Sequence, residues 1–265
     1  VGREESLALA VMSGAPQPPA SMAWLHRERR NTTPEADSIL TWFGPEPQDF
    51  RRAKWGDITL KRGVIEMEPV IFRGASVSTA VVVYAPGETE FITVFPPETA
   101  GGRIRAESTP TEGIRTLRWT PHAVESDAAA RDGDGRLLAV GRDGRTATVF
   151  RATAEARWEV VQTLTAPEND VFRELHGLAG GGMASLMAPA TAASDSAATR
   201  LGVYAARNGR LELAFLSDLP VAAPTPVVVA RVLLFDRDPF RDPNALELES
   251  LPAGDWVRGA TIAAG

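Results

Sequence analysis

A tight turn of one pattern occurs twice in this 265-residue chain and limits the fold more than any other feature. The two copies are Arg142-Asp143-Gly144-Arg145 and Arg207-Asn208-Gly209-Arg210, and each lies between short apolar runs. A Phe follows each copy at the same distance, as Phe150 and Phe215. Asp-Gly and Asn-Gly favour β-hairpins because a type I′ turn needs positive φ at both central residues. The pattern therefore predicts an all-β protein built from repeated antiparallel hairpins.

Apolar and β-branched runs bounded by turn residues extend this prediction along the chain from about residue 55. The expected strands are Ile58–Leu60, Val64–Glu68, Ser78–Tyr84, Glu90–Phe95, Ile114–Trp119, Leu137–Val140, Thr146–Phe150, Trp158–Leu164, Met183–Met187, Leu201–Tyr204, Leu211–Leu216 and Val227–Phe235. Pro86-Gly87 predicts a turn between the third and fourth of them. We expect residues 98–113 to form a loop, and Glu168–Leu178 to be helical or irregular.

The first 50 residues differ in composition from the rest of the chain. Proline residues interrupt them, and Ser21–Arg30 has the apolar spacing of a short amphipathic helix. Thr33-Pro34 resembles a helix start, with Thr33 as the cap and Pro34 in the first turn. We therefore predict a Pro-rich, partly helical N-terminal extension over 1–50 and a β-rich body over 51–265, with a subdivision of the body near 98–113.

Residues 114–164 resemble one blade of a WD-repeat-type β-propeller. The similarity rests on an alternating first strand, then Gly135-Arg136-Leu137-Leu138-Ala139-Val140, the Asp-Gly turn and two further strands. The hairpins Ala80–Phe95 and Leu201–Phe215 align with the central part of this unit. The resemblance implies stacked four-stranded sheets, because one such sheet cannot bury both of its faces alone. The match is incomplete, because Val149-Phe150 stands where the family has its Trp-Asp pair. A plain β-sandwich or barrel explains the same hairpins and is the alternative architecture.

Charge and composition exclude some classes of partner. The net charge of −6 and the pI near 5.3 argue against nucleic-acid binding, which needs a basic face. The chain has no Cys, and no apolar run approaches the ~20 residues that a transmembrane helix needs. Heavy use of Arg, Ala, Gly and Pro indicates a GC-rich bacterial genome. The absence of Cys is compatible with an exported protein and equally with a cytoplasmic one. Because the sequence begins with Val rather than Met, we expect a processed or trimmed form, and a periplasmic or extracytoplasmic location is slightly favoured over a cytoplasmic one.

Residue patterns for catalysis, cofactor binding or metal binding are not evident in the sequence. His26, His122 and His176 lack partners at metal-ligand spacing. Residues 132–136 have two carboxylates but place Arg136 where a calcium loop needs an oxygen ligand. Residues 180–185 contain three glycines without the Lys of a phosphate-binding loop. We therefore assign no catalytic, cofactor-binding or metal-binding residue and expect no cofactor.

These observations favour a non-catalytic binding or scaffold subunit of a larger bacterial protein assembly. Trp, Phe, Met and Arg are enriched at protein interfaces, and they gather in the N-terminal 50 residues. The predicted partner-binding residues are Met22, Trp24, Arg27, Trp42 and Phe43. One alternative is a carbohydrate-active or other hydrolase, which would need two carboxyl groups in a concave pocket. Another is a structural protein of a phage-tail-like or secretion assembly, suggested by Ile58–Val64.

Overall fold

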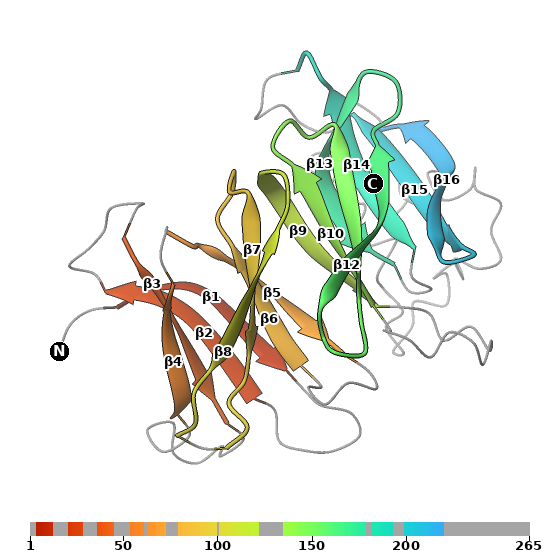
Figure 1. Cartoon of the computed structure of the whole chain (residues 1–265). Coiled ribbons are helices and arrows are strands. Elements are labelled where there is room, and N and C mark those ends of the chain that lie inside the picture. The colour runs from red at the N-terminus through yellow and green to blue at the C-terminus, as the bar shows by residue number, and fades with distance from the viewer. Residues whose placement is uncertain are drawn as a thin grey trace, which may run out of the picture. The chain divides into compact units, whose positions relative to one another are not determined.

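The computed structural model describes residues 4–12, 21–28, 36–44, 54–60, 63–72, 79–99, 101–121, 135–178, 182–192 and 199–219. Within these ranges the protein is all-β, with 16 strands and no helix. The strands form four antiparallel sheets of four strands each (Figure 1). The chain divides into two compact units, with the first two sheets in the first unit and most of the other two in the second.

The first unit contains two sheets in which strands pair in chain order (Figure 1, red to yellow). The first sheet consists of β1 (Glu4–Met12), β2 (Ser21–Glu28), β3 (Ser38–Phe43) and β4 (Lys54–Leu60). The second consists of β5 (Glu66–Ile71), β6 (Thr79–Tyr84), β7 (Glu90–Phe95) and β8 (Arg105–Pro110). Pro69 lies in β5, the first strand of its sheet, where a missing N–H costs least.

The second unit contains two sheets of the same order. The third sheet consists of β9 (Ile114–Pro121), β10 (Gly135–Gly141), β11 (Thr146–Ala152) and β12 (Trp158–Thr165). The fourth consists of β13 (Asp170–Gly177), β14 (Met183–Pro189), β15 (Arg200–Arg207) and β16 (Arg210–Asp218). Within each of these sheets, every strand lies beside the strand that precedes it in the chain.

In the second, third and fourth sheets the second strand is the most buried one, and the fourth strand is mostly accessible. Every residue of β6 is buried, and so is all but the last residue of β10 and of β14. The fourth strands bury little: β8 has no buried residue, and β4 has one. A strand buried on both faces needs a layer on each side of its sheet. This repeated gradient is consistent with propeller-like blades.

Each unit has its own apolar core between its two sheets. In the first unit, Leu25, Leu40 and Trp42 of the first sheet pack with Val81 and Val94 of the second. In the second unit, apolar residues of the third and fourth sheets form the corresponding cluster: Leu138, Val140, Ala147, Val149, Phe172, Leu175, Met183, Met187 and Tyr204. Apolar contact between sheets therefore holds each pair together.

Polar contacts add to the core of the second unit. The Gln162 amide of β12 donates to the Leu211 carbonyl and accepts from the Leu211 N–H of β16, both at 2.8 Å. The backbone N–H of Phe172 donates to the carbonyl of Gly144 at 2.8 Å. Two of these bonds use the side-chain amide of Gln162 and the third joins two backbone groups, and together they fix the third sheet on the fourth.

The two repeated turns form hairpins, as predicted, but their geometries differ. Asn208 and Gly209 have φ of 48° and 77°, which is the type I′ turn expected from the sequence. In the other copy only Gly144 has positive φ, at 72°, and its N–H bonds to the carbonyl of Gly141 at 2.8 Å. In that hairpin Arg142 and Asp143 are the central residues of the turn, one position earlier in the motif than Asn208 and Gly209. Gly144 follows the turn with a positive φ.

The prediction of helices in the N-terminal region is wrong. Ser21–Glu28 and Ser38–Phe43 are strands, and together with β1 and with β4, which follows residue 50, they form the first sheet. The physical reason lies in β2, where Ala23 and Leu25 alternate with Met22 and Trp24 on opposite faces, a period of two. Thr33 and Pro34 lie outside the described residues.

Two further expectations are corrected. Residues 98–113 contain β8, and Glu168–Leu178 contains β13, so neither is a loop or a helix throughout. The third hairpin of the repeat is also out of phase. Leu201–Phe215 covers the third and fourth strands of its sheet, whereas the other two hairpins cover second and third strands. The expected strand Val227–Phe235 lies outside the described residues.

Candidate functional site

The five predicted partner-binding residues all lie in the first sheet, at different depths. Trp42 is fully buried and belongs to the core of the first unit. Arg27 is 8% exposed, so its side chain is buried too. Met22, Trp24 and Phe43 are half-buried. Their partner-binding role stays a prediction, but only the last three leave side-chain surface accessible.

These three residues lie on the face of the first sheet that points away from the core of its unit. Trp24 is opposite Leu9 of β1 and Thr41 of β3, and Met22 is opposite Phe43. Side chains opposite each other in an antiparallel sheet project from the same face. Because neighbouring Ala23 and Leu25 are in the core, Met22, Trp24 and Phe43 face the other way. We call this surface, with Leu9, the outer face of the first sheet.

The outer face combines exposed apolar surface with fixed aromatic geometry. Leu9 is 59% exposed, although burial of an apolar side chain away from water is favourable. The Trp24 ring stacks on His26 at 4.0 Å between centroids, and its Nε1 donates to the Ser6 hydroxyl at 3.0 Å. The His26 Nε2 lies 3.0 Å from the Thr41 hydroxyl. The aromatic group is therefore held in one orientation rather than left free on the surface.

A groove of about 510 Å³ lies at the outer edge of the same sheet. Its lining comes from the start of β4 and from the segment before β8: Lys54, Trp55, Gly56, Asp57, Gly101, Gly102, Arg103 and Ile104. We call it the β4 groove. It adjoins the outer face, because Lys54 is opposite Phe43 and Asp57 is opposite Thr41.

Glycines give the β4 groove its shape. A Cβ on Gly44 would lie 1.8 Å from the Trp55 ring, so the ring packs directly on the Gly44 backbone. A Cβ on Gly56 would meet the Gly102 carbonyl at 3.2 Å, so β4 passes close to the opposite wall. Gly101 has a φ of 76° and open space around the position of its missing Cβ. The groove therefore exposes backbone as well as side chains.

The charged groups of the groove include a single carboxylate, Asp57, which accepts a hydrogen bond from Lys54 Nζ at 2.8 Å. A glycosidase needs two carboxyl groups about 5–10 Å apart across its cleft. Arg103 is an exposed cation on the opposite wall. The arrangement therefore offers charge recognition, hydrogen bonding and an aromatic surface.

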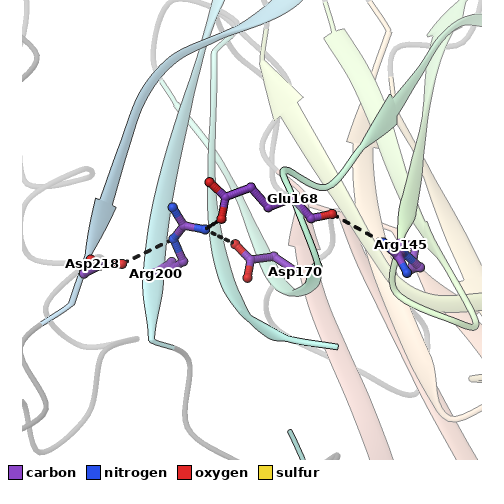
Figure 2. A network of polar contacts seen from close by, with 5 residues as sticks. All are labelled: Arg145, Glu168, Asp170, Arg200 and Asp218. Atoms are coloured by element: carbon purple, nitrogen blue, oxygen red, sulfur yellow. Dashed lines mark hydrogen bonds and ion pairs between the residues drawn. The ribbon is translucent and has the colours of Figure 1, made fainter. Parts of the chain in front are cut away.

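A separate polar network in the second unit centres on Arg200 of β15 (Figure 2). One Nη of Arg200 lies 2.8 Å from a carboxylate oxygen of Glu168 and 2.8 Å from one of Asp170. Its Nε lies 3.3 Å from Asp218 of β16. Arg145, in the hairpin turn of the third sheet, donates to the Glu168 carbonyl at 3.4 Å. The hydrogen bond to Glu168, with the attraction of Asp170 and Glu168, raises the pKa of Arg200, so this guanidinium stays charged.

Two other buried ionisable groups belong to the second unit. Burial raises the pKa of the Tyr204 phenol to about 12. Arg136 of β10 is 4% exposed and lies opposite Arg151 of β11. Burial, together with the charge of Arg151, lowers the pKa of Arg136. Neither group lines the β4 groove.

The described residues contain no group of three or more His, Asp or Glu placed to hold a metal ion. They also include no helix with the length and apolar character that a membrane crossing requires. No known family model matches the chain, and no curated protein is significantly similar to it.

Proposed function

We propose that this chain is a propeller-like, non-catalytic binding subunit that docks onto other proteins of a larger assembly. The observation that carries the proposal is the outer face of the first sheet. It presents Leu9, Met22, Trp24 and Phe43 with their side chains partly accessible. Apolar patches with aromatic and Met side chains are typical of protein interfaces.

The sheet repeat supports the propeller-like part of the proposal. In the first unit, β1 lies beside β5, so the first strands of two successive sheets are neighbours. The second strands β6, β10 and β14 are almost completely buried, and each fourth strand buries at most one residue. First strands at the centre and fourth strands at the rim are typical of propeller blades. Binding through strand faces and rims needs no catalytic group.

Site-specific photo-crosslinking in cells that produce the protein tests this function. A benzophenone amino acid replaces Leu9, which is 59% exposed on the outer face. The matched control carries it at Val160 of β12, which is 61% exposed in another sheet. We expect a defined heterologous adduct from position 9 and not from position 160. Trp24→Asp in the position-9 chain should abolish the adduct.

Two results would contradict the proposal. The same adducts from both positions would mean that the outer face has no special affinity. An adduct from position 9 that contains only this chain would identify self-association rather than docking onto a different protein. Folding of each variant is checked by urea unfolding, where an exposed substitution such as Leu9 should change the free energy by no more than about 0.5 kcal/mol.

A further inference from the structure

We propose that the β4 groove binds an extended, acidic segment of a partner protein, which pairs as an added strand along the edge of β4 that faces away from β3. This inference rests on the proposed binding function and names the partner's chemistry at a second position. The β4 groove lies next to the outer face, since Lys54 and Phe43 are opposite each other on neighbouring strands. One partner can therefore contact both surfaces.

The backbone of β4 offers a place for an added strand. In the described sheet β4 is the last strand, and it pairs with β3 along one side only. An edge strand presents N–H and C=O groups that can pair with an extended peptide. Gly101 lines the groove with open space around the position of its missing Cβ, so this wall leaves room for a second backbone. An added strand is the occupant that uses these groups best.

The charges that line the β4 groove favour an acidic ligand. Lys54 and Arg103 contribute two positive charges to the lining and Asp57 contributes one negative charge, which leaves a net +1. The whole chain carries −6, so the groove has the opposite sign to the molecule. The ion pair of Lys54 with Asp57 is about half exposed, at 47% and 53%. Such pairs contribute about 0–1 kcal/mol, so an acidic ligand competes for Lys54 at little cost.

Trp55 and Ile104 favour a ligand that also carries apolar side chains. Both line the groove, and Trp55 is half-buried against the Gly44 backbone. Successive side chains of an added strand point to opposite sides. An acidic-apolar alternation therefore turns carboxylates to one side of the added strand and apolar groups to the other, in a groove that offers two cations and the apolar Trp55 and Ile104. The groove thus selects an extended segment with an acidic-apolar alternation.

Binding of a synthetic peptide to the full chain tests the inference. The probe is an acetylated, fluorescently labelled peptide of three Glu-Val repeats, measured by fluorescence anisotropy. One control peptide has Lys in place of each Glu, and another carries N-methyl groups on alternate residues, which block strand pairing. We expect binding of the Glu-Val peptide and at least about tenfold weaker binding of both controls, a difference of about 1.4 kcal/mol.

Variants of the chain locate the binding. Arg103→Glu should weaken the Glu-Val peptide at least about tenfold. Arg142→Glu is the matched control, because Arg142 is exposed in a hairpin turn of the other unit and the charge change is identical. Equal effects of the two variants would overturn the inference by showing that only net charge matters. Undiminished binding of the N-methylated peptide would overturn the strand-pairing mode.

The outcomes also separate this inference from the proposed function. Absence of peptide binding together with a position-9 adduct in the crosslinking experiment would overturn the groove inference and leave docking through the outer face intact. Absence of both would contradict the proposed function as well. Peptide binding without the adduct would place partner recognition in the groove and remove it from the outer face.

Discussion

Replacement of Arg200 by Met tests how much of the second unit depends on one buried ion pair. Asp170 has only 5% of its side chain exposed, and Arg200 has 19% exposed. Glu168 and Asp218, the other two carboxylates near Arg200, are 71% and 87% exposed. Loss of Arg200 therefore leaves the exposed carboxylates to water and the Asp170 carboxylate without its cation in a buried place.

The expected loss follows from this difference in exposure. Removal of one partner of a buried ion pair costs about 3–5 kcal/mol, because an uncompensated charge remains inside the protein. Since Arg200 is itself partly exposed, we expect a loss near the lower end, about 3 kcal/mol. Asp218→Asn removes only a surface contact and should cost less than about 1 kcal/mol. The two variants differ because of burial, although both remove a partner from the same network.

Urea unfolding followed by circular dichroism measures these losses as shifts of the midpoint at constant m-value. The double variant Arg200→Met with Asp170→Asn should recover most of the lost free energy, because it removes the buried charge as well as its cation. An Arg200→Met loss below about 1 kcal/mol would refute the reasoning, since Asp170 would then not depend on Arg200. A double variant less stable than Arg200→Met would refute it in a second way.

Three further changes have defined outcomes. Burial raises the pKa of Tyr204 to about 12, above the ordinary 10.0. The free energy of unfolding should therefore fall by about 2–3 kcal/mol between pH 10 and 12, relative to that of Tyr204→Phe, as measured by urea unfolding at each pH. Gln162→Ala should cost about 1–2 kcal/mol in the same assay, because it removes both bonds to Leu211, whereas Gln162→Glu should keep part of this. Gly44→Ala should displace the Trp55 ring, shift tryptophan emission to longer wavelength and weaken Glu-Val peptide binding, while unchanged emission would contradict that packing.

Strands with regular alternation were predictable from the sequence, and those with irregular register were not. Ser78–Tyr84 and Glu90–Phe95 flank a Pro-Gly turn, and they form β6 and β7 nearly as predicted. In β13 the apolar residues have a spacing that also suits a helix. The structure contains a register shift between Phe172 and Glu174. Because of this bulge, Phe172 and Leu175 both reach the core although they are three positions apart.

The candidate surfaces were predictable only in part. Met22, Trp24 and Phe43 were singled out by residue type, and the structure brings them to one face of a sheet. The β4 groove was missed, because its walls come from residues 54–57 and 101–104, which are far apart in the sequence. Two signals were present, the Trp55-Gly56 and Gly101-Gly102 pairs. The sequence does not show that these two pairs lie next to each other, because the burial of apolar residues does not specify which sheet edges come together.

The burial gradient is the physical reason why we propose recognition at β4 rather than at strands that are buried along their whole length. A second strand such as β6, buried along its whole length, cannot change without disturbing two layers of packing. A fourth strand such as β4 buries one residue, so Lys54, Trp55 and Asp57 contribute little to the core. Substitutions at such exposed positions change the free energy of unfolding little, so the residues there can be suited to ligand binding. The proposed binding at β4 would therefore cost little stability, and buried strands such as β6 would give the sheets their rigid support.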